Sequence, residues 1–156
     1  MGDYIQYIRS FVGKNKIIMV ASGVFIIDSE ERVLLQLRSD INKWGYPGGF
    51  MELGEKVVDT VRREAFEETG LNLGNLELLG IYSGTEHECT FPNGDQAAVL
   101  KITFICKDYD GAIDLSNEES LSLKYFPLSS LPDIWENQKP EFEDLLLRHN
   151  NKPFIR

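Results

Sequence analysis

The sequence predicts a mixed α/β or α+β fold in which helices cover the faces of a mixed β-sheet. Strand-like segments occur before, between and after helical ones, which is typical of this class. The 156 residues are 42% hydrophobic, which is enough for one compact core. No internal repeat or low-complexity linker divides the chain. We therefore expect a single domain over residues 1–156.

The N-terminal segment predicts a helix followed by two strands. Gly13 is a stop signal after a helix at about residues 3–12, whose apolar positions recur at helical spacing. Those positions are Tyr4, Ile5, Ile8, Phe11 and Val12. Residues 17–27 and 32–37 are strand-like and enclose the polar turn 28–31. We expect the helix to cover the core, with a dimer contact as the alternative.

A loop and then a second helix are predicted in the next part of the chain. Residues 44–49 are rich in Gly and Pro and are expected to form the loop. Residues 56–69 contain neither Gly nor Pro, and Gly70 stands where a C-terminal cap belongs, so this segment predicts a helix. One stripe of this helix is apolar and is expected to face the sheet. Its members are Val58, Val61 and Ala65.

The second half of the chain predicts a hairpin, a further strand and a final helix. Strand-like stretches at 76–91 and 96–106 flank residues 92–95, whose Asn-Gly pair favours a tight turn. The second stretch alternates apolar residues onto one face, as a strand packed on a core does. Those residues are Ala98, Leu100, Ile102, Phe104 and Cys106. A strand is expected at 124–127 and a helix at about 140–150, with an apolar side formed by Phe142, Leu145 and Leu146.

The charge balance bears on the class of partner. The formal net charge is −9, from 25 acidic and 16 basic residues. A nucleic-acid polymer is therefore not an expected partner, because its backbone is bound by clustered Lys and Arg. A small phosphate-bearing ligand is still compatible with this charge if divalent cations bridge the two sets of negative groups.

Three further features predict a reduced, cytoplasmic protein. Cys89 and Cys106 lie in predicted strands without a CxxC spacing, so both are expected to be free core thiols. The apolar run at 17–27 is too short to span a membrane as a helix, and no export signal is evident.

His87 stands alone among polar residues and is expected to be structural or exposed.

A cluster of carboxylates is the first indication of chemistry. Glu64, Glu67 and Glu68 lie at helical spacing and project from neighbouring turns of the predicted helix. Such like charges repel one another, and a hard divalent cation with oxygen ligands would relieve the repulsion. The alternative is a solvated acidic face, balanced by Arg62 and Arg63.

The residues around this cluster follow a longer pattern. Its fixed positions are Gly49, Glu55, Arg63, Glu64, Ala65, Glu67, Glu68, Gly70 and Leu71. Their spacing resembles the signature of the Nudix hydrolase (MutT-like) family, with Ala65 smaller than the aliphatic residue often found there. Residues 33–38 and 44–49 also look like the strand and loop that precede the signature. The resemblance implies a Nudix-like α/β/α sandwich with a mixed sheet and a loop–helix–loop signature motif.

The same resemblance implies roles for these residues. Glu64, Glu67 and Glu68 would hold Mg²⁺, for which Mn²⁺ can substitute, and the Gly49 carbonyl is a further candidate ligand. Glu55 and Arg63 look like the pair that orients the ligands. The general base that deprotonates water would be Glu64 or a distal acid, Glu118 or Glu119. The last two could equally be solvated loop residues.

Substrate contacts are predicted on three residues near the glycine loop. Arg38 could neutralise a phosphate or lie on the surface as an ordinary arginine. Trp44 and Tyr46 could stack on a base or could instead buttress the glycines. For the two aromatic residues the buttressing role is favoured, because aromatic residues next to a Gly-Gly pair usually fill space.

The predicted function is Mg²⁺-dependent hydrolysis of a phosphoanhydride bond in a small nucleotide. The substrate would be a nucleoside triphosphate, or ADP-ribose, a nucleotide sugar or a dinucleotide. The alternative class is a nucleotide-binding sensor or interaction module of the same fold, and a Nudix-fold isomerase of isoprenoid diphosphates is a further option. The full set of signature glutamates disfavours a purely binding role. A homodimer is a possible assembly.

Overall fold

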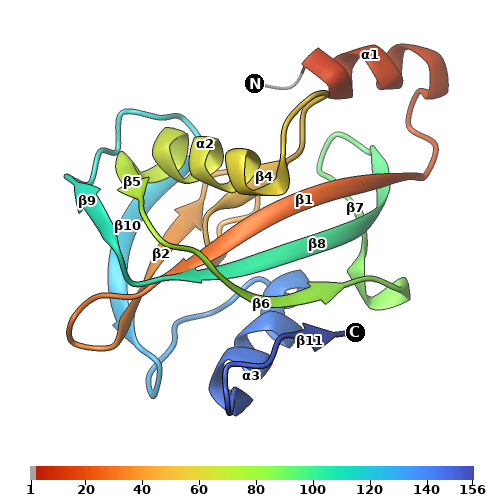
Figure 1. Ribbon diagram of the computed structural model, residues 1–156. Helices are drawn as coiled ribbons and strands as arrows, with labels where there is room; N and C mark the ends of the chain where they lie inside the picture. Colours follow the sequence, from red (N-terminus) through yellow and green to blue (C-terminus); the bar gives the residue numbers. More distant parts are fainter. Residues whose placement is uncertain (1–2) are drawn as a thin grey trace.

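The computed structural model describes residues 3–156 and has three α-helices around β-sheets (Figure 1). The helices are α1 (Asp3–Val12), α2 (Val57–Thr69) and α3 (Lys139–Leu147). Helices α1 and α2 agree with the predicted ranges, and Gly70 caps α2 in the left-handed conformation with a φ of 80°. Helix α3 is shorter than predicted, because Arg148 leaves the helical conformation with a ψ of 121°.

The main sheet is mixed, as the sequence predicted. Its strands are β1 (Ile17–Ile26), β4 (Gly48–Phe50), β6 (Glu77–Tyr82), β7 (Glu88–Thr90), β8 (Gln96–Cys106) and β11 (Phe154–Ile155). They are ordered β11-β6-β8-β1-β4, and β7 pairs with β8. Strands β1 and β8 run parallel from the Ile17–Ala97 pair to the Ile26–Cys106 pair, and β11 runs parallel to β6. Strand β4 is antiparallel to β1, and β6 and β7 are antiparallel to β8. The predicted turn between β7 and β8 is present, with Gly94 at a φ of 91°.

Two smaller sheets complete the fold. Strands β10 (Ser120–Pro127), β2 (Arg32–Arg38) and β3 (Trp44–Gly45) form one, and β5 (Leu71–Leu73) pairs with β9 (Tyr109–Gly111) in the other. Short 3₁₀ turns η1 (Thr85–His87) and η2 (Glu136–Gln138) precede β7 and α3.

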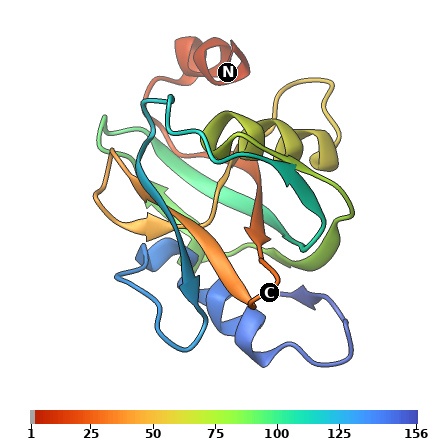
Figure 2. The ribbon, with the colours of Figure 1, turned by 90° about the vertical axis from the view of Figure 1, so that its left-hand side faces the viewer.

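Helices α2 and α3 lie on opposite sides of the sheets, giving an α/β/α arrangement (Figures 1 and 2). Val61 and Ala65 of α2 are fully buried against one face of β1 and β8. Phe142 of α3 packs on the other face, where its ring lies 4.8 Å from that of Phe25. The face of β8 predicted to be buried is fully buried only at Phe104 and Cys106, whereas Ala98, Leu100 and Ile102 are half-buried. The opposite face of β8 is buried from residue 97 to residue 105, which the pattern did not predict.

Four sequence predictions need correction. The loop expected at 44–49 contains β3 and part of β4, because its glycines pair with β2 and β1. The stretch at 76–91 is interrupted where Gly84 adopts a φ of 102°. Strand β10 begins before residue 124, extending along the whole of β2. Leu146 is 55% exposed and does not share the buried side of α3.

Helix α1 lies beside the sheet rather than on its central core (Figure 1). Ile5 packs against a small cluster around Met19, while Phe11 is 71% exposed. Arg9 links helix α1 to the start of β8, because its guanidinium donates to the Gln96 carbonyl at 2.8 Å and lies 3.6 Å from the Asp95 carboxylate. None of the helices in residues 3–156 is long and apolar enough to cross a membrane.

Candidate active site

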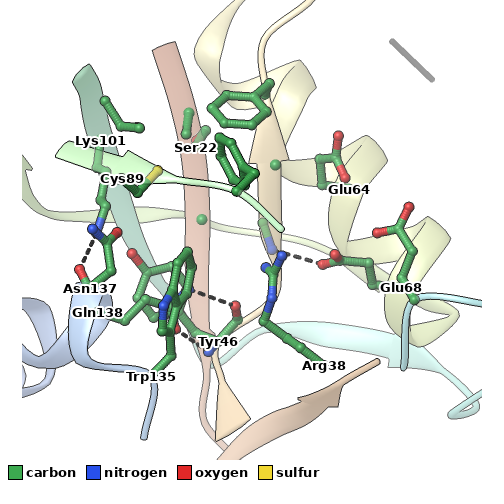
Figure 3. Close-up of a pocket in the computed structure, with 18 of the residues that line it drawn as sticks. Ser22, Arg38, Tyr46, Glu64, Glu68, Cys89, Lys101, Trp135, Asn137 and Gln138 are labelled. Atoms are coloured by element: carbon green, nitrogen blue, oxygen red, sulfur yellow. Dashed lines mark hydrogen bonds between the residues drawn. The ribbon is translucent and has the colours of Figure 1, made fainter. Parts of the chain in front are cut away.

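A cavity of about 250 Å³ opens where β1, β4, α1, α2 and η2 meet. Glu64, Glu67 and Glu68 line one end of it. Lys101 and Asn137 line the other end, across Ser22, Tyr46 and Trp135 (Figure 3). The pocket thus has an acidic end and a second, chemically different end.

Glycines form the backbone wall of the acidic end. A Cβ on Gly48 would lie 2.6 Å from the Cα of Gly23, and one on Gly49 would lie 2.3 Å from the carboxyl carbon of Glu64. The Gly48 N–H donates to the Glu68 carboxylate at 2.8 Å. Only glycine lets the loop approach both strand β1 and helix α2 so closely.

Glu55 and Arg63 form a tight pair at the start of α2. Arg63 donates from Nε and Nη2 to the two carboxylate oxygens of Glu55 at 2.6 and 3.0 Å. Glu55 also accepts from the Glu52 N–H and the Thr60 hydroxyl. The Arg63 guanidinium is the largest cause that lowers the pKa of Glu55, which falls to about 2. This geometry suits the orienting role predicted for the pair.

Arg63 also reaches the acidic cluster. Its Nη1 donates to Glu64 at 2.7 Å and lies 3.5 Å from a carboxylate oxygen of Glu67. Glu68 is directed instead toward the Gly48 N–H. With these side-chain positions, residues 3–156 hold no group of three acidic, His or Cys residues gathered closely enough for a metal ion.

The donor set nevertheless fits a hard divalent cation. Carboxylate oxygens are the ligands that Mg²⁺ takes in proteins. The Arg63 guanidinium already places positive charge between Glu64 and Glu67, where a cation would neutralise both. Arg63 is held by Glu55 and by the Phe50 carbonyl as well, so it has other acceptors when Glu64 turns toward a metal.

Burial makes the two inner glutamates reluctant to ionise. Glu68 is only 3% exposed, and burial, with the nearby charge of Glu64, raises its pKa well above the usual value. Burial also raises the pKa of Glu64, against the opposing effect of Arg63. A bound cation would stabilise both carboxylates in their ionised form.

The structure distinguishes the two distal acids. Glu119 lines the pocket beside Arg38 and close to Glu68. Glu118 is exposed, does not line the pocket, and uses its carbonyl to accept from the Ser39 hydroxyl at 2.9 Å.

The residues predicted to contact the substrate also differ in whether they line the pocket. Arg38 lines the pocket, pairs with Asp40 at 2.8 Å and lies with its guanidinium 4.9 Å from the Trp135 ring. Trp44 does not line the pocket and packs edge-on against Phe126 at 4.8 Å. Tyr46 lines the floor but is only 4% exposed, and its hydroxyl donates to Glu141 at 2.9 Å. Trp44 thus packs on β10 away from the pocket, and the buried Tyr46 ring has no open face for stacking.

Sequence reasoning missed the residues at the second end of the pocket. Lys101, Trp135 and Asn137 line it, and Cys89, expected in the core, is half-buried at its edge. A charged residue within the apolar alternation of β8 was the available signal for Lys101. His87 is fully buried, with its ring 5.9 Å from that of Tyr82, in agreement with a structural role.

The glycine loop leads into helix α2, which carries the carboxylates and packs on the mixed sheet. This is the α/β/α domain with a loop–helix–loop motif that the sequence predicted. The family model for the NUDIX domain matches residues 18–146. The chain therefore belongs to the Nudix family.

Individual relatives agree with this assignment. An ADP-ribose pyrophosphatase of Methanocaldococcus jannaschii is 34% identical over 112 residues, covering 70% of this chain and 62% of that protein. Nucleoside diphosphate-linked moiety X motif 6 of Mus musculus is 30% identical and matches 72% of this chain but only 35% of its own length. The chain thus spans between about a third and two thirds of these curated relatives.

Solved structures show the same fold. The MutT Nudix hydrolase of Burkholderia pseudomallei superposes with a TM-score of 0.71 at 24% identity, covering 83% of this chain and 98% of that one. The mutator MutT protein of Bacillus halodurans has a TM-score of 0.70 at 28% identity, covering 88% of this chain and 86% of that one.

Proposed function

We propose that this protein hydrolyses a phosphoanhydride bond in a small nucleoside diphosphate derivative with the help of a divalent cation. The observation that carries the proposal is the set of carboxylates on α2, Glu64, Glu67 and Glu68, which face one pocket beside the Gly48–Gly49 backbone. An ADP-ribose pyrophosphatase and MutT proteins among the relatives support the same reaction class.

Glu64, Glu67 and Glu68 would hold the cation, with the Gly49 carbonyl as a further ligand. When bound, Mg²⁺ or Mn²⁺ supplies neutralising charge for the phosphates and makes water a better nucleophile. Glu55 holds Arg63, and Arg63 in turn orients Glu64, so the pair positions the carboxylates. Arg38 has its guanidinium in the pocket and contributes positive charge toward a phosphate.

Glu119 is our candidate for the general base. It lines the pocket from the loop before β10, whereas Glu64 is engaged by Arg63. A base must accept the proton of the attacking water, and a carboxylate that is free of a tight ion pair can do so. Replacing Glu119 with Gln should lower kcat, whereas Glu118→Gln, the matched control, should leave kcat unchanged. Equal losses in the two variants would reject this assignment.

The test of the reaction is a panel of nucleotides with Mg²⁺, monitored by chromatography of the products. The panel contains nucleoside triphosphates, ADP-ribose, a nucleotide sugar and a dinucleotide. We expect turnover of at least one of them and its severe loss in Glu67→Gln and in Glu68→Gln, with the fold retained. Binding without product formation would instead favour the nucleotide sensor, the second class of function. Full activity in both variants would refute the assigned metal ligands.

The expected partner is thus a small nucleotide. A homodimer and a cytoplasmic location stay predictions from the sequence. Phe11 and Tyr7 of α1 are exposed aromatic residues that such a dimer could cover.

A further inference from the structure

A buried lysine at the second end of the pocket has no role in the proposed hydrolysis. Lys101 lies in β8 and is only 6% exposed, yet its side chain lines the pocket. A lysine is rarely buried unless its charge is paired. Here the partner is Glu141 of α3, fully buried, whose carboxylate accepts from the Lys101 ammonium at 2.9 Å.

The contacts of this pair leave one donor for a ligand. The Lys101 ammonium donates to the Asn137 carbonyl and to Glu141. An ammonium has three N–H donors and no acceptor. Within the described residues these are the two acceptors close to the ammonium, so its third N–H has no acceptor there, and the Lys101 side chain lines the pocket.

The pair presents this donor without a large net charge. Glu141 balances the lysine, and the same carboxylate oxygen also accepts from the Tyr46 hydroxyl at 2.9 Å. A phosphate would need an unbalanced positive charge, or a cation, to offset its desolvation. A neutral acceptor such as a carbonyl oxygen needs only the hydrogen bond.

The position of Lys101 separates it from the reacting phosphates. Lys101, Cys89 and Asn137 lie on one side of the pocket, and Glu64 and Glu68 lie on the other (Figure 3). Apolar side chains, among them Val99 and Phe50, line the pocket between α1 and β8. A substrate whose diphosphate lies at the glutamates would place its nucleoside in the direction of Lys101. Apolar walls with one fixed donor are suited to a nucleobase edge.

We propose that Lys101 makes this pocket selective for nucleobases with a carbonyl oxygen at C6 of a purine or C4 of a pyrimidine, as in hypoxanthine, guanine or uracil, over those with an amino group there, adenine and cytosine. This inference rests on the proposed function, because it assumes that the substrate is a nucleotide. The O6 of a six-oxopurine or the O4 of uracil would accept from the ammonium. The amino group of adenine or cytosine at the same position would meet a second donor and leave both unsatisfied.

The test uses pairs of nucleotides that differ in one exocyclic group. Inosine and adenosine form one pair, and uridine and cytidine form the other. Binding of their monophosphates to the metal-free protein is measured by calorimetry, and kcat/KM of their triphosphates is measured with Mg²⁺. We expect the keto member to be favoured roughly tenfold or more in each pair, since a hydrogen bond to a charged donor is involved.

The variant must remove the donor without leaving a buried charge. Lys101→Met combined with Glu141→Gln removes both charges, and Lys101→Arg is the control that keeps a cationic donor paired with Glu141. Thermal unfolding verifies that both variants are folded. The double variant should lose the keto preference, and the control should retain it.

A wild-type protein that prefers the amino member or neither, or a preference that survives in the double variant, would overturn the role of Lys101. In either case, turnover of any nucleotide would leave the proposed hydrolysis intact. Conversely, Lys101-dependent binding of inosine monophosphate without turnover of any nucleotide would support the base selectivity and reject the hydrolysis.

Discussion

Replacing Glu55 with Gln should destabilise the protein in a pH-dependent way. The substitution keeps the shape of the side chain but removes the charge that pairs with Arg63 at 2.6 and 3.0 Å. The pKa of Glu55 falls from 4.5 to about 2 in the folded protein. A shift of this size corresponds to about 3 kcal/mol at most.

Solvent reduces this figure, because the Glu55 side chain is 18% exposed and that of Arg63 is 23% exposed. We therefore expect Glu55→Gln to lower the free energy of unfolding by about 1–2 kcal/mol at pH 7. The folded pKa is depressed, so the stabilisation is present above the unfolded pKa and is lost as pH falls through the folded pKa. The difference between wild type and variant should thus shrink between about pH 5 and pH 2.

Urea unfolding followed by fluorescence at pH 7, 5 and 3 measures this difference. Glu143→Gln is the matched control, because Glu143 is exposed on α3 and its removal should change stability by less than about 0.5 kcal/mol. A difference between wild type and Glu55→Gln that stays constant from pH 7 to pH 3 would show that the charge of Glu55 does not stabilise the fold.

Three other substitutions test separate parts of the structure. Glu68→Gln should lower activity by more than about 100-fold. The same variant should unfold at a higher temperature than wild type at pH 8 without metal, because a raised carboxyl pKa in the folded state costs stability as pH rises. Gly48→Ala should cost about 1–3 kcal/mol in thermal unfolding, since its Cβ would lie 2.6 Å from the backbone of β1. Arg9→Ala should accelerate amide hydrogen exchange in α1 and leave that of α2 unchanged, because it removes the contacts with Gln96 and Asp95.

The acidic end of the site could be predicted because its residues are close in sequence. Glu64, Glu67 and Glu68 share one helix, and a helix fixes their relative positions. The Glu55–Arg63 pair spans only eight residues. The spacing of these residues along the sequence was therefore enough to predict the acidic end of the pocket.

The second end could not be predicted, because pairing between distant segments creates it. Lys101 reaches the pocket through the parallel register that places it beside Ala21. Asn137 comes from η2 and Trp135 directly precedes it. The position of η2 depends on contacts such as that between the Gln138 side chain and the Tyr46 N–H. Trp44 was a plausible stacking residue, yet the pairing of β3 with β2 directs it toward Phe126 instead.

The glycine wall also has a consequence for how such a pocket can diversify. At Gly48 a methyl group would collide with the backbone of strand β1, and at Gly49 it would displace the Glu64 carboxylate, so substitutions in this half disturb either the sheet or a signature glutamate. The opposite half is built from side chains of three separate elements, which can be exchanged one at a time. Mutational drift or laboratory selection could therefore change the second end of the pocket while the glycine wall and the carboxylates of α2 stay fixed.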